Sequence, residues 1–129
     1  MPPRGGVTVP GGRPHILRRT MDLPDEVSPQ EAHAAVSGGG ACLLDVREPW
    51  EWRDRRIPGA VLIPLVELPN RRGELPADVD VYVYCRAGRR SRHAVEYLRS
   101  SGRARSVNVA GGIDAWEAAG LPLAEQPPS

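Results

Sequence analysis

The residues most able to do chemistry lie in one short segment, where a cysteine is followed by several arginines. This segment, residues 85–90, reads CRAGRR and directly follows the apolar run of residues 79–84. A cysteine beyond the carboxyl end of a parallel strand lies where α/β folds place their ligands. Backbone N–H groups of such a loop can point inward at an anion, and a following helix adds the positive end of its dipole. These features favour thiolate over thiol, so we expect Cys85 to be a nucleophile at cellular pH.

The positive charge around this cysteine indicates an anionic substrate. Gly88 permits a positive φ inside the tight loop. The loop residues expected to bind the substrate are Arg86, Ala87, Gly88, Arg89 and Arg90. From the spacing alone, a buried strand-end cysteine followed by solvated arginines is an equal alternative, because cysteine is among the most buried residue types. The nucleophile hypothesis therefore requires a thiol that is ionised under physiological conditions and open to solvent.

The segments that must position this loop predict an α/β fold with a mostly parallel sheet, because short apolar runs alternate with helical patterns. Strands are expected at residues 41–46, 60–63, 79–84 and 106–109. Helices are expected at residues 29–38, after a capping box, and at residues 48–54, 89–102 and 112–120. Residues 64–78 contain Pro, Asn and Gly and predict a connecting loop with room for one helical turn.

The composition predicts a single soluble domain. The chain has 129 residues, of which 40% are hydrophobic and 26% charged, as is ordinary for a globular protein. Its 17 basic residues, all arginine, oppose 16 acidic ones, so no global field attracts nucleic acid or an anionic membrane. No run approaches the roughly 18 apolar residues of a membrane helix, and no signal peptide is visible. We therefore expect a cytoplasmic protein without nucleic-acid or membrane partners.

The ends of the chain differ from its middle in composition. Residues 1–20 are rich in Pro, Gly and Arg and predict a disordered tail, residues 21–124 the folded domain, and residues 125–129 a disordered C-terminus. Cys42 and Cys85 match no metal-ligand spacing, and in a reducing compartment both should stay unbridged. Cys42 is expected to be a core residue, as are Trp52 and Trp116, whereas Trp50 is expected on the surface.

Four motifs, in order over residues 25–123, make the chain similar to the single-domain rhodaneses, a family of sulfurtransferases. The motifs are LLDVREP at residues 43–49 followed by Glu51-Trp52, IPGA at residues 57–60, CRAGRRS at residues 85–91, and GGIDAW at residues 111–116 followed by Gly120-Leu121-Pro122. One position departs from the pattern, because Arg55-Arg56 stands where the family commonly has Gly-His. The departure puts in doubt the packing of this connection.

The resemblance implies a five-stranded sheet with helices on both faces, and Cys85 as the catalytic residue. By analogy, Cys85 attacks the sulfane sulfur of thiosulfate or another donor, releases sulfite and holds the sulfur as a persulfide. A thiol or cyanide acceptor, or a sulfur-relay protein, then takes the sulfur, and no cofactor or metal is needed. In this family reading Asp45, Arg47 and Ser91 support the site structurally.

Two other functions compete with sulfur transfer. The first is a binding or regulatory module that keeps the fold without turnover. The second is phosphatase or arsenate reductase chemistry, for which the related cell-cycle phosphatases have a loop one residue longer, with an arginine six positions after the cysteine. Here Arg90 lies five positions after Cys85 and the sixth position is Ser91, so the loop favours sulfur transfer.

Overall fold

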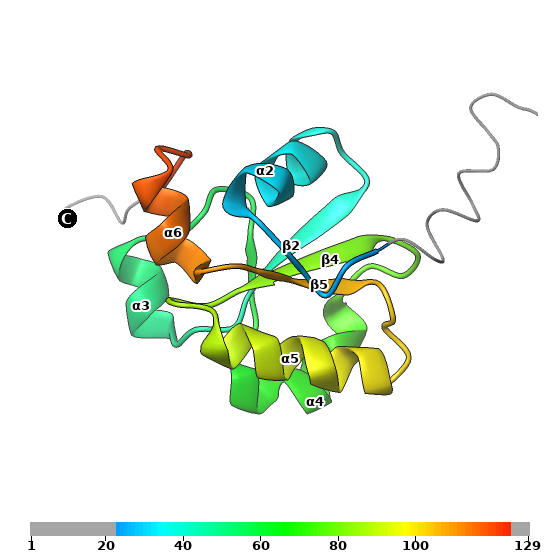
Figure 1. The fold of residues 1–129 in the computed structure, drawn as a ribbon. Coiled ribbons are helices and arrows are strands. Elements are labelled where there is room, and N and C mark those ends of the chain that lie inside the picture. The colour runs from blue at the N-terminus through cyan, green and yellow to red at the C-terminus, as the bar shows by residue number, and fades with distance from the viewer. Residues whose placement is uncertain (1–22, 125–129) are drawn as a thin grey trace, which may run out of the picture.

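A five-stranded parallel sheet organises residues 23–124, the residues that the computed structural model describes (Figure 1). The strand order is β1-β5-β4-β2-β3. The strands are β1 (Glu26–Val27), β2 (Ala41–Asp45), β3 (Val61–Leu62), β4 (Asp80–Tyr84) and β5 (Ser106–Val109). The predicted α/β class and the five-stranded sheet are confirmed. The tails predicted at residues 1–20 and 125–129 lie outside the described residues.

The edge strand β1 is the strand, among the described residues, that the sequence patterns did not predict. It pairs in parallel with β5, with Glu26 opposite Asn108 and Val27 opposite Val109. Two residues are too few to show the alternation that marks a strand in a sequence. Only the pairing with β5, far away along the chain, makes this segment extended.

Helices lie between successive strands and, in the case of the last helix, after the last strand. They are α2 (Pro29–Ser37), α3 (Pro49–Asp54), α4 (Leu68–Arg71), α5 (Arg89–Ser100) and α6 (Gly112–Ala118). The predicted capping box is present, because Ser28 Oγ accepts from the Glu31 N–H and the Glu31 carboxylate accepts from the Ser28 N–H. The connection at 64–78 is more helical than predicted, since short 3₁₀ turns at Leu65–Glu67 and Arg72–Glu74 flank α4.

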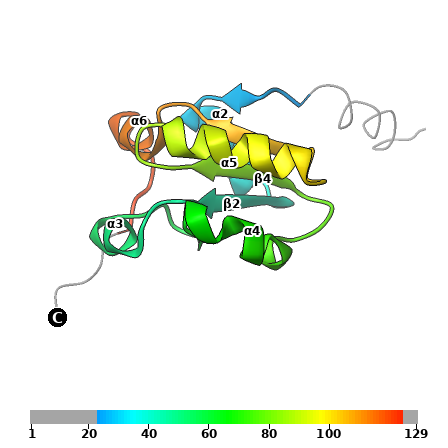
Figure 2. The same cartoon turned by 90° about the horizontal axis from the view of Figure 1, so that it is seen from below.

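Each face of the sheet has its own apolar core. Alternate side chains of β4 point to opposite faces, so Val81 and Val83 pack with α4 and α5, whereas Tyr82 and Tyr84 pack with α2 and α6 (Figures 1 and 2). Two parallel strands covered on both faces need continuous apolar runs, which explains the sequence of β2 and β4.

The tryptophan predictions are confirmed in two cases of three. Trp116 is 2% exposed and Trp50 is 66% exposed, as expected. Trp52 is only half-buried, and the Arg56 guanidinium lies over its ring at 5.2 Å. The prediction of Trp52 as a core residue is wrong, because α3 lies at the rim of the sheet, where an arginine and not a second apolar layer covers the indole. No helix among residues 23–124 has the length and apolar character to span a membrane.

Candidate active site

Cys85 lies at the end of β4, where the chain turns within three residues into α5. Gly88 precedes the helix with a φ of 105°, a left-handed conformation that favours glycine. A Cβ at this position would lie 3.3 Å from the Gly111 nitrogen, which is a tight contact. The turn brings the N–H of Gly88 to 3.1 Å from the Cys85 sulfur. The sequence-predicted nucleophile therefore lies within a ring of loop amides at a helix N-terminus.

Hydrogen bonds decide the ionisation of Cys85. Burial alone raises the pKa of the thiol, since it penalises the anion. The Ser91 hydroxyl and the backbone N–H groups of Ser91, Gly88 and Ala87 act in the other direction, and together they hold the pKa below its usual value. The structure thus supports the electrostatic half of the nucleophile hypothesis.

The N-terminus of α6 holds the loop in this shape. The N–H groups of Ile113 and Asp114 donate to the carbonyl oxygens of Cys85 and Arg86 at 2.9 and 3.1 Å. A Cβ at Gly112 would lie 2.3 Å from the Cys85 carbonyl oxygen, so only glycine permits this contact. The carbonyl groups of the loop thus bond to α6, and the N–H groups of the loop face the sulfur.

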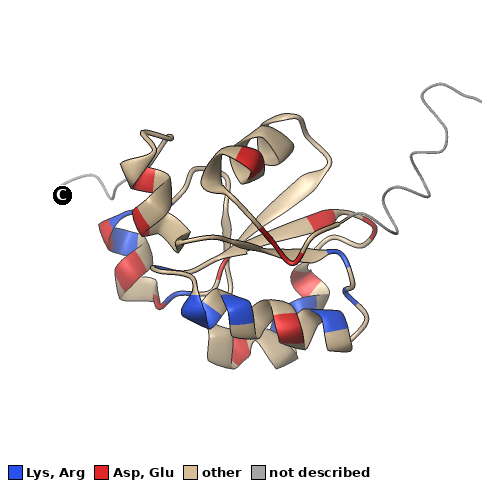
Figure 3. Cartoon of the chain, in the orientation of Figure 1, with Lys and Arg blue, Asp and Glu red and all other residues tan. Residues whose placement is uncertain are grey.

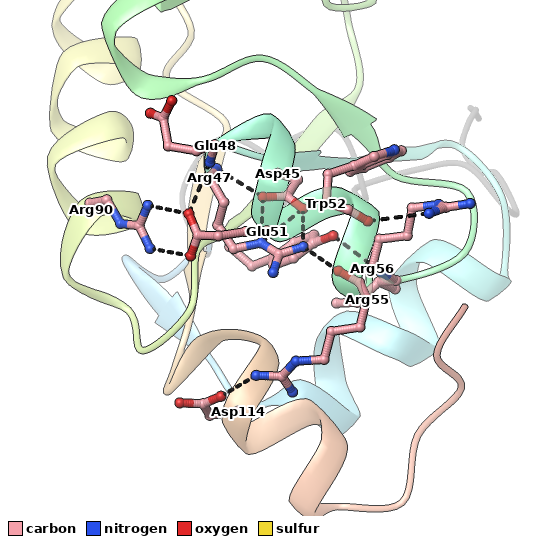
Figure 4. A network of polar contacts seen from close by, with 11 residues as sticks. Asp45, Arg47, Glu48, Glu51, Trp52, Arg55, Arg56, Arg90 and Asp114 are labelled. Atoms are coloured by element: carbon pink, nitrogen blue, oxygen red, sulfur yellow. Dashed lines mark hydrogen bonds and ion pairs between the residues drawn. The ribbon is translucent and has the colours of Figure 1, made fainter. Parts of the chain in front are cut away.

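The arginines of the loop, which the sequence predicted to surround Cys85 with positive charge, differ in their exposure and their partners. Arg86 and Arg89 are exposed, and Arg86 Nε lies 3.5 Å from Asp114. Arg90 instead donates two hydrogen bonds to Glu51, at 2.8 and 2.9 Å. The expectation that Arg90 binds the substrate stays a prediction, and its guanidinium is already bonded to the buried Glu51 carboxylate (Figure 4). Arginines also dominate the charged residues of α5, where Glu96 is the one acidic residue, whereas α3 carries charges of both signs (Figure 3).

Glu51 is a residue whose role sequence reasoning missed. Its carboxylate accepts from the Glu48 N–H at 2.9 Å, which closes the first turn of α3, and from Arg90 at the start of α5. The Arg90 hydrogen bonds are the largest cause that lowers the pKa of Glu51. The signal in the sequence was the capping position of Glu51 three residues after Glu48.

Asp45 and Arg47 form a buried ion pair beside the loop. Arg47 Nε and Nη2 lie 3.0 and 2.8 Å from the two oxygens of Asp45, and Nη2 also donates to the Arg55 carbonyl oxygen at 2.7 Å (Figure 4). Asp45 pairs across the sheet with Tyr84, the residue before Cys85. The ion pair therefore connects β2 with the end of β4 and with the residue after α3.

The unusual Arg55-Arg56 connection is packed by both of its side chains. Arg55 forms ion pairs with Asp114 and Glu117 of α6, the first at 2.6 Å. Arg56 exchanges backbone hydrogen bonds with Ala124 and stacks on Trp52. The doubt about this connection is answered, because the two arginines join it to α6 and to the end of the described chain.

The sulfur atom is not open to solvent. Cys85 is 1% exposed, so the expectation of an open thiol is wrong. A cavity of about 200 Å³ beside the loop is lined by Arg47, Trp50, Glu51, Asp54, Arg55 and Arg86, and Cys85 is not among its lining residues. Both cysteines are free, and residues 23–124 hold no cluster of His, Cys, Asp and Glu suited to a metal ion.

Two polar residues complete the surroundings of the sulfur. The Ser91 hydroxyl lies 3.4 Å from Cys85 Sγ and 2.5 Å from Asn108 Oδ1. Asn108 was not among the predicted site residues. Its signal was a single amide within the buried strand β5, since a buried polar side chain needs partners.

Comparison with known proteins identifies the family. The model of the rhodanese-like domain matches residues 28–119. The chain belongs to the rhodanese-like domain family. Its rhodanese-like domain is also similar to a solved rhodanese-related protein of Thermoplasma volcanium, with a TM-score of 0.72, 32% identity, and coverage of 78% of this chain and 98% of that one.

Relatives of this rhodanese-like chain carry names that refer to sulfur. A sulfurtransferase of Allochromatium vinosum is 44% identical over 63% of this chain and 76% of its own length. A putative sulfur carrier protein of Bacillus subtilis, YrkF, is 39% identical over 57% of this chain but only 40% of its own length. The first relative is thus matched over most of its length, and the second over less than half. These similarities support sulfur transfer as the general activity.

Proposed function

We propose that this rhodanese-like protein transfers sulfane sulfur through a persulfide on Cys85. The observation that carries the proposal is the set of donors around the sulfur, namely the N–H groups of Ala87, Gly88 and Ser91 and the Ser91 hydroxyl. Donors fixed in this way stabilise an anion without reorganising when the charge forms. They suit a thiolate and equally the terminal sulfur of a persulfide.

The reaction consists of two displacements on sulfur. The Cys85 thiolate attacks the outer sulfur of a donor such as thiosulfate, a new S–S bond forms, and the S–S bond of the donor breaks with its electron pair leaving on sulfite. A nucleophilic acceptor, either a thiolate or cyanide, then attacks the outer sulfur of the persulfide and regenerates the Cys85 thiolate. Each step conserves electrons within the exchanging bonds, so no external oxidant or reductant is required.

The donor is expected to meet the exposed part of the loop first. Arg86 and Arg89 are the exposed positive charges there, and Ala87 between them is also exposed. Because Cys85 is 1% exposed, the loop has to open before a donor reaches the sulfur. Sulfur-relay proteins are possible partners on the same surface, as the name of the sulfur-carrier relative indicates.

The burial of Cys85 also favours a second candidate, a binding or regulatory module without turnover. A cysteine that no donor reaches would serve only to hold the loop in place. The two candidates differ in one property, which is whether Cys85 gains a sulfur atom.

The deciding experiment exposes the protein to thiosulfate and measures its intact mass, and then adds cyanide and measures thiocyanate. We expect the mass to rise by one sulfur atom and to fall back as thiocyanate forms, in the wild type and in Cys42→Ala. Cys85→Ala should show neither change, because the nucleophile is missing. A wild-type protein that gains no sulfur from thiosulfate, from a persulfide of a small thiol or from a protein persulfide would establish the non-catalytic module.

A further inference from the structure

A buried chain of hydrogen bonds leads from Cys85 to the edge of the sheet. Ser91 and Asn108 are 0% and 2% exposed. The Ser91 hydroxyl is 3.4 Å from the Cys85 sulfur and 2.5 Å from Asn108 Oδ1, and Asn108 Nδ2 is 2.8 Å from the Glu26 carboxylate. A cavity of about 270 Å³ is lined by both Glu26 and Asn108. The chain thus runs from a thiol through a hydroxyl and an amide to a carboxylate on β1.

The surroundings of Asn108 fix the orientation of its amide. Its Nδ2 group faces two acceptors, the Glu26 carboxylate at 2.8 Å and the Gly88 carbonyl oxygen at 3.4 Å. Neither acceptor can donate a hydrogen bond, so the reversed amide would set oxygen against oxygen. The Oδ1 atom is therefore held toward Ser91 and accepts the hydroxyl proton.

The proton of Ser91 has two competing acceptors. A hydroxyl carries one proton, so it cannot donate fully to Asn108 and to Cys85 at once. While the proton points to Asn108, the lone pairs of Ser91 face the sulfur and suit a protonated thiol. When the sulfur is anionic, the hydroxyl has to turn toward it, and the buried Oδ1 of Asn108 loses its donor, which is unfavourable.

We propose that Asn108, oriented by Glu26, is a positioning residue that limits how strongly Ser91 stabilises the Cys85 anion. The inference rests on the proposed function, because it assigns a role only if Cys85 is the nucleophile. Limited stabilisation has a chemical advantage, since the nucleophilicity of a thiolate falls as its pKa falls. The competition therefore balances the amount of thiolate against its reactivity.

Charged groups of the neighbouring elements also surround the hydrogen bonds between Cys85 and Glu26. Arg90 of α5 interacts electrostatically with Cys85 and is paired with Glu51 of α3. Glu26 of β1 also accepts from Arg92 of α5 at 3.0 Å. The other charged groups near the loop and the carboxylate are Asp45 at the end of β2 and Arg47 after it, Arg86 of the loop, Arg89 at the start of α5, Asp114 of α6, and the pair Asp25–Arg99.

The test measures the pKa of Cys85 from the pH dependence of its alkylation by iodoacetamide, in a Cys42→Ala background so that one thiol reacts. Asn108→Leu removes the competing carbonyl at similar volume, so we expect the pKa to fall by about one unit. Asn108→Asp supplies a stronger, charged acceptor, so we expect the pKa to rise by a similar amount. A merely structural residue would not shift the pKa in opposite directions.

The Ser91→Ala background shows whether the effect passes through the hydroxyl. Without that hydroxyl, Asn108→Leu should leave the pKa of Cys85 unchanged. The matched control is Ser106→Ala, which removes a buried hydroxyl of β5 that is bonded to the Arg103 carbonyl oxygen. This variant should not shift the pKa of Cys85. A pKa that rises or stays constant in Asn108→Leu, or that falls equally in the Ser91→Ala background, would overturn the inference.

Glu26→Gln decides the matter if the Asn108 variants do not fold. A glutamine can donate as well as accept, so the Asn108 amide is free to turn, and we expect the pKa of Cys85 to fall by about half a unit. Asp25→Asn is its control, because it removes a neighbouring charge that pairs with Arg99. Equal shifts of the Cys85 pKa in the two variants would show that the loss of a negative charge alone causes the shift, and would overturn the inference. These pKa measurements need no sulfur donor, so a negative result for this inference can be distinguished from a negative result in the thiocyanate assay.

Discussion

The two cysteines of this protein belong to the same apolar core, yet the pKa of one is raised and that of the other is lowered. Cys42 and Cys85 both belong to the core that packs against α4 and α5, and they are 9% and 1% exposed. Burial raises the pKa of Cys42, and the charge of Arg103 offsets this only in part. Cys85 is the more buried of the two, yet its pKa is lowered.

The difference follows from which end of a strand each cysteine occupies. Cys42 stands near the start of β2 and pairs with Val81 of β4, where the backbone N–H and C=O groups are consumed by the sheet. Cys85 stands just beyond the end of β4, where the chain leaves the sheet and its next amides are free to turn toward the sulfur. Burial thus makes a thiol inert or reactive according to the donors that the local backbone can offer.

The largest change to this contrast is expected from Gly112→Ala. A methyl group there meets the Cys85 carbonyl oxygen at 2.3 Å with φ at +60°, so the loop cannot stay on α6. We expect unfolding by denaturant to show a loss of about 3 kcal/mol or more, together with loss of sulfur transfer. Gly120→Ala, with a similar φ of +76° and no atom within 4 Å, should cost only about 1–2 kcal/mol and keep activity. Equal costs in the two variants would show that α6 does not hold the loop.

The next largest effect is the difference in reactivity between the two thiols. At pH 7 we expect iodoacetamide to alkylate Cys85 at least about tenfold faster than Cys42, because only Cys85 has a stabilised thiolate. Peptide mass spectrometry after timed quenching gives both rates in one sample. In concentrated urea the rates should converge. Equal protection of both thiols in the folded protein would show that the loop does not open to expose a stabilised Cys85 thiolate.

A smaller effect is expected from the ion pair that anchors the start of α5. Arg90 is 37% exposed, so after solvent screening Glu51→Gln should cost about 1 kcal/mol of stability at pH 7. The pKa of Glu51 is lowered by folding, so its contribution is present above its unfolded pKa of about 4.3 and is lost as the pH falls through the folded value.

Denaturation curves of Glu51→Gln and wild type should therefore differ at pH 7 and approach each other below about pH 4. Glu74→Gln breaks the exposed pair with Arg71 and should not change stability measurably. A difference for Glu51→Gln that persists unchanged in acid would show that packing, and not the ion pair, is the cause.

The smallest effect concerns the exposed arginines around Cys85. Arg86→Ala and Arg89→Ala should each raise the KM for thiosulfate about threefold with little change in kcat, because the charge attracts the donor equally before and during reaction. The increase should shrink at high ionic strength. Arg71→Ala, whose guanidinium is paired with Glu67 and Glu74, is the control. Unchanged KM in both loop variants would remove these arginines from donor binding.

The sequence by itself determined the class of fold, the position of Cys85 as the proposed nucleophile, and the strand–loop–helix succession around it. Two of the signals were local patterns, namely the apolar runs at β2 and β4 and the capping box before α2. Local patterns can be recognised from the sequence because they involve residues close together along the chain. The same holds for Cys85, because a strand, a glycine and a helix in succession specify where the amides point.

Only the tertiary structure decided what lies across from those residues. β1 pairs with β5, and Arg90 is bonded to Glu51, which is 39 residues away. Asn108 is 17 residues from Ser91 and yet shares its proton. Hydrogen bonds and ion pairs act between neighbours in space, and a sequence lists neighbours along the chain, so these partners became visible only when the sheet brought its strand ends together.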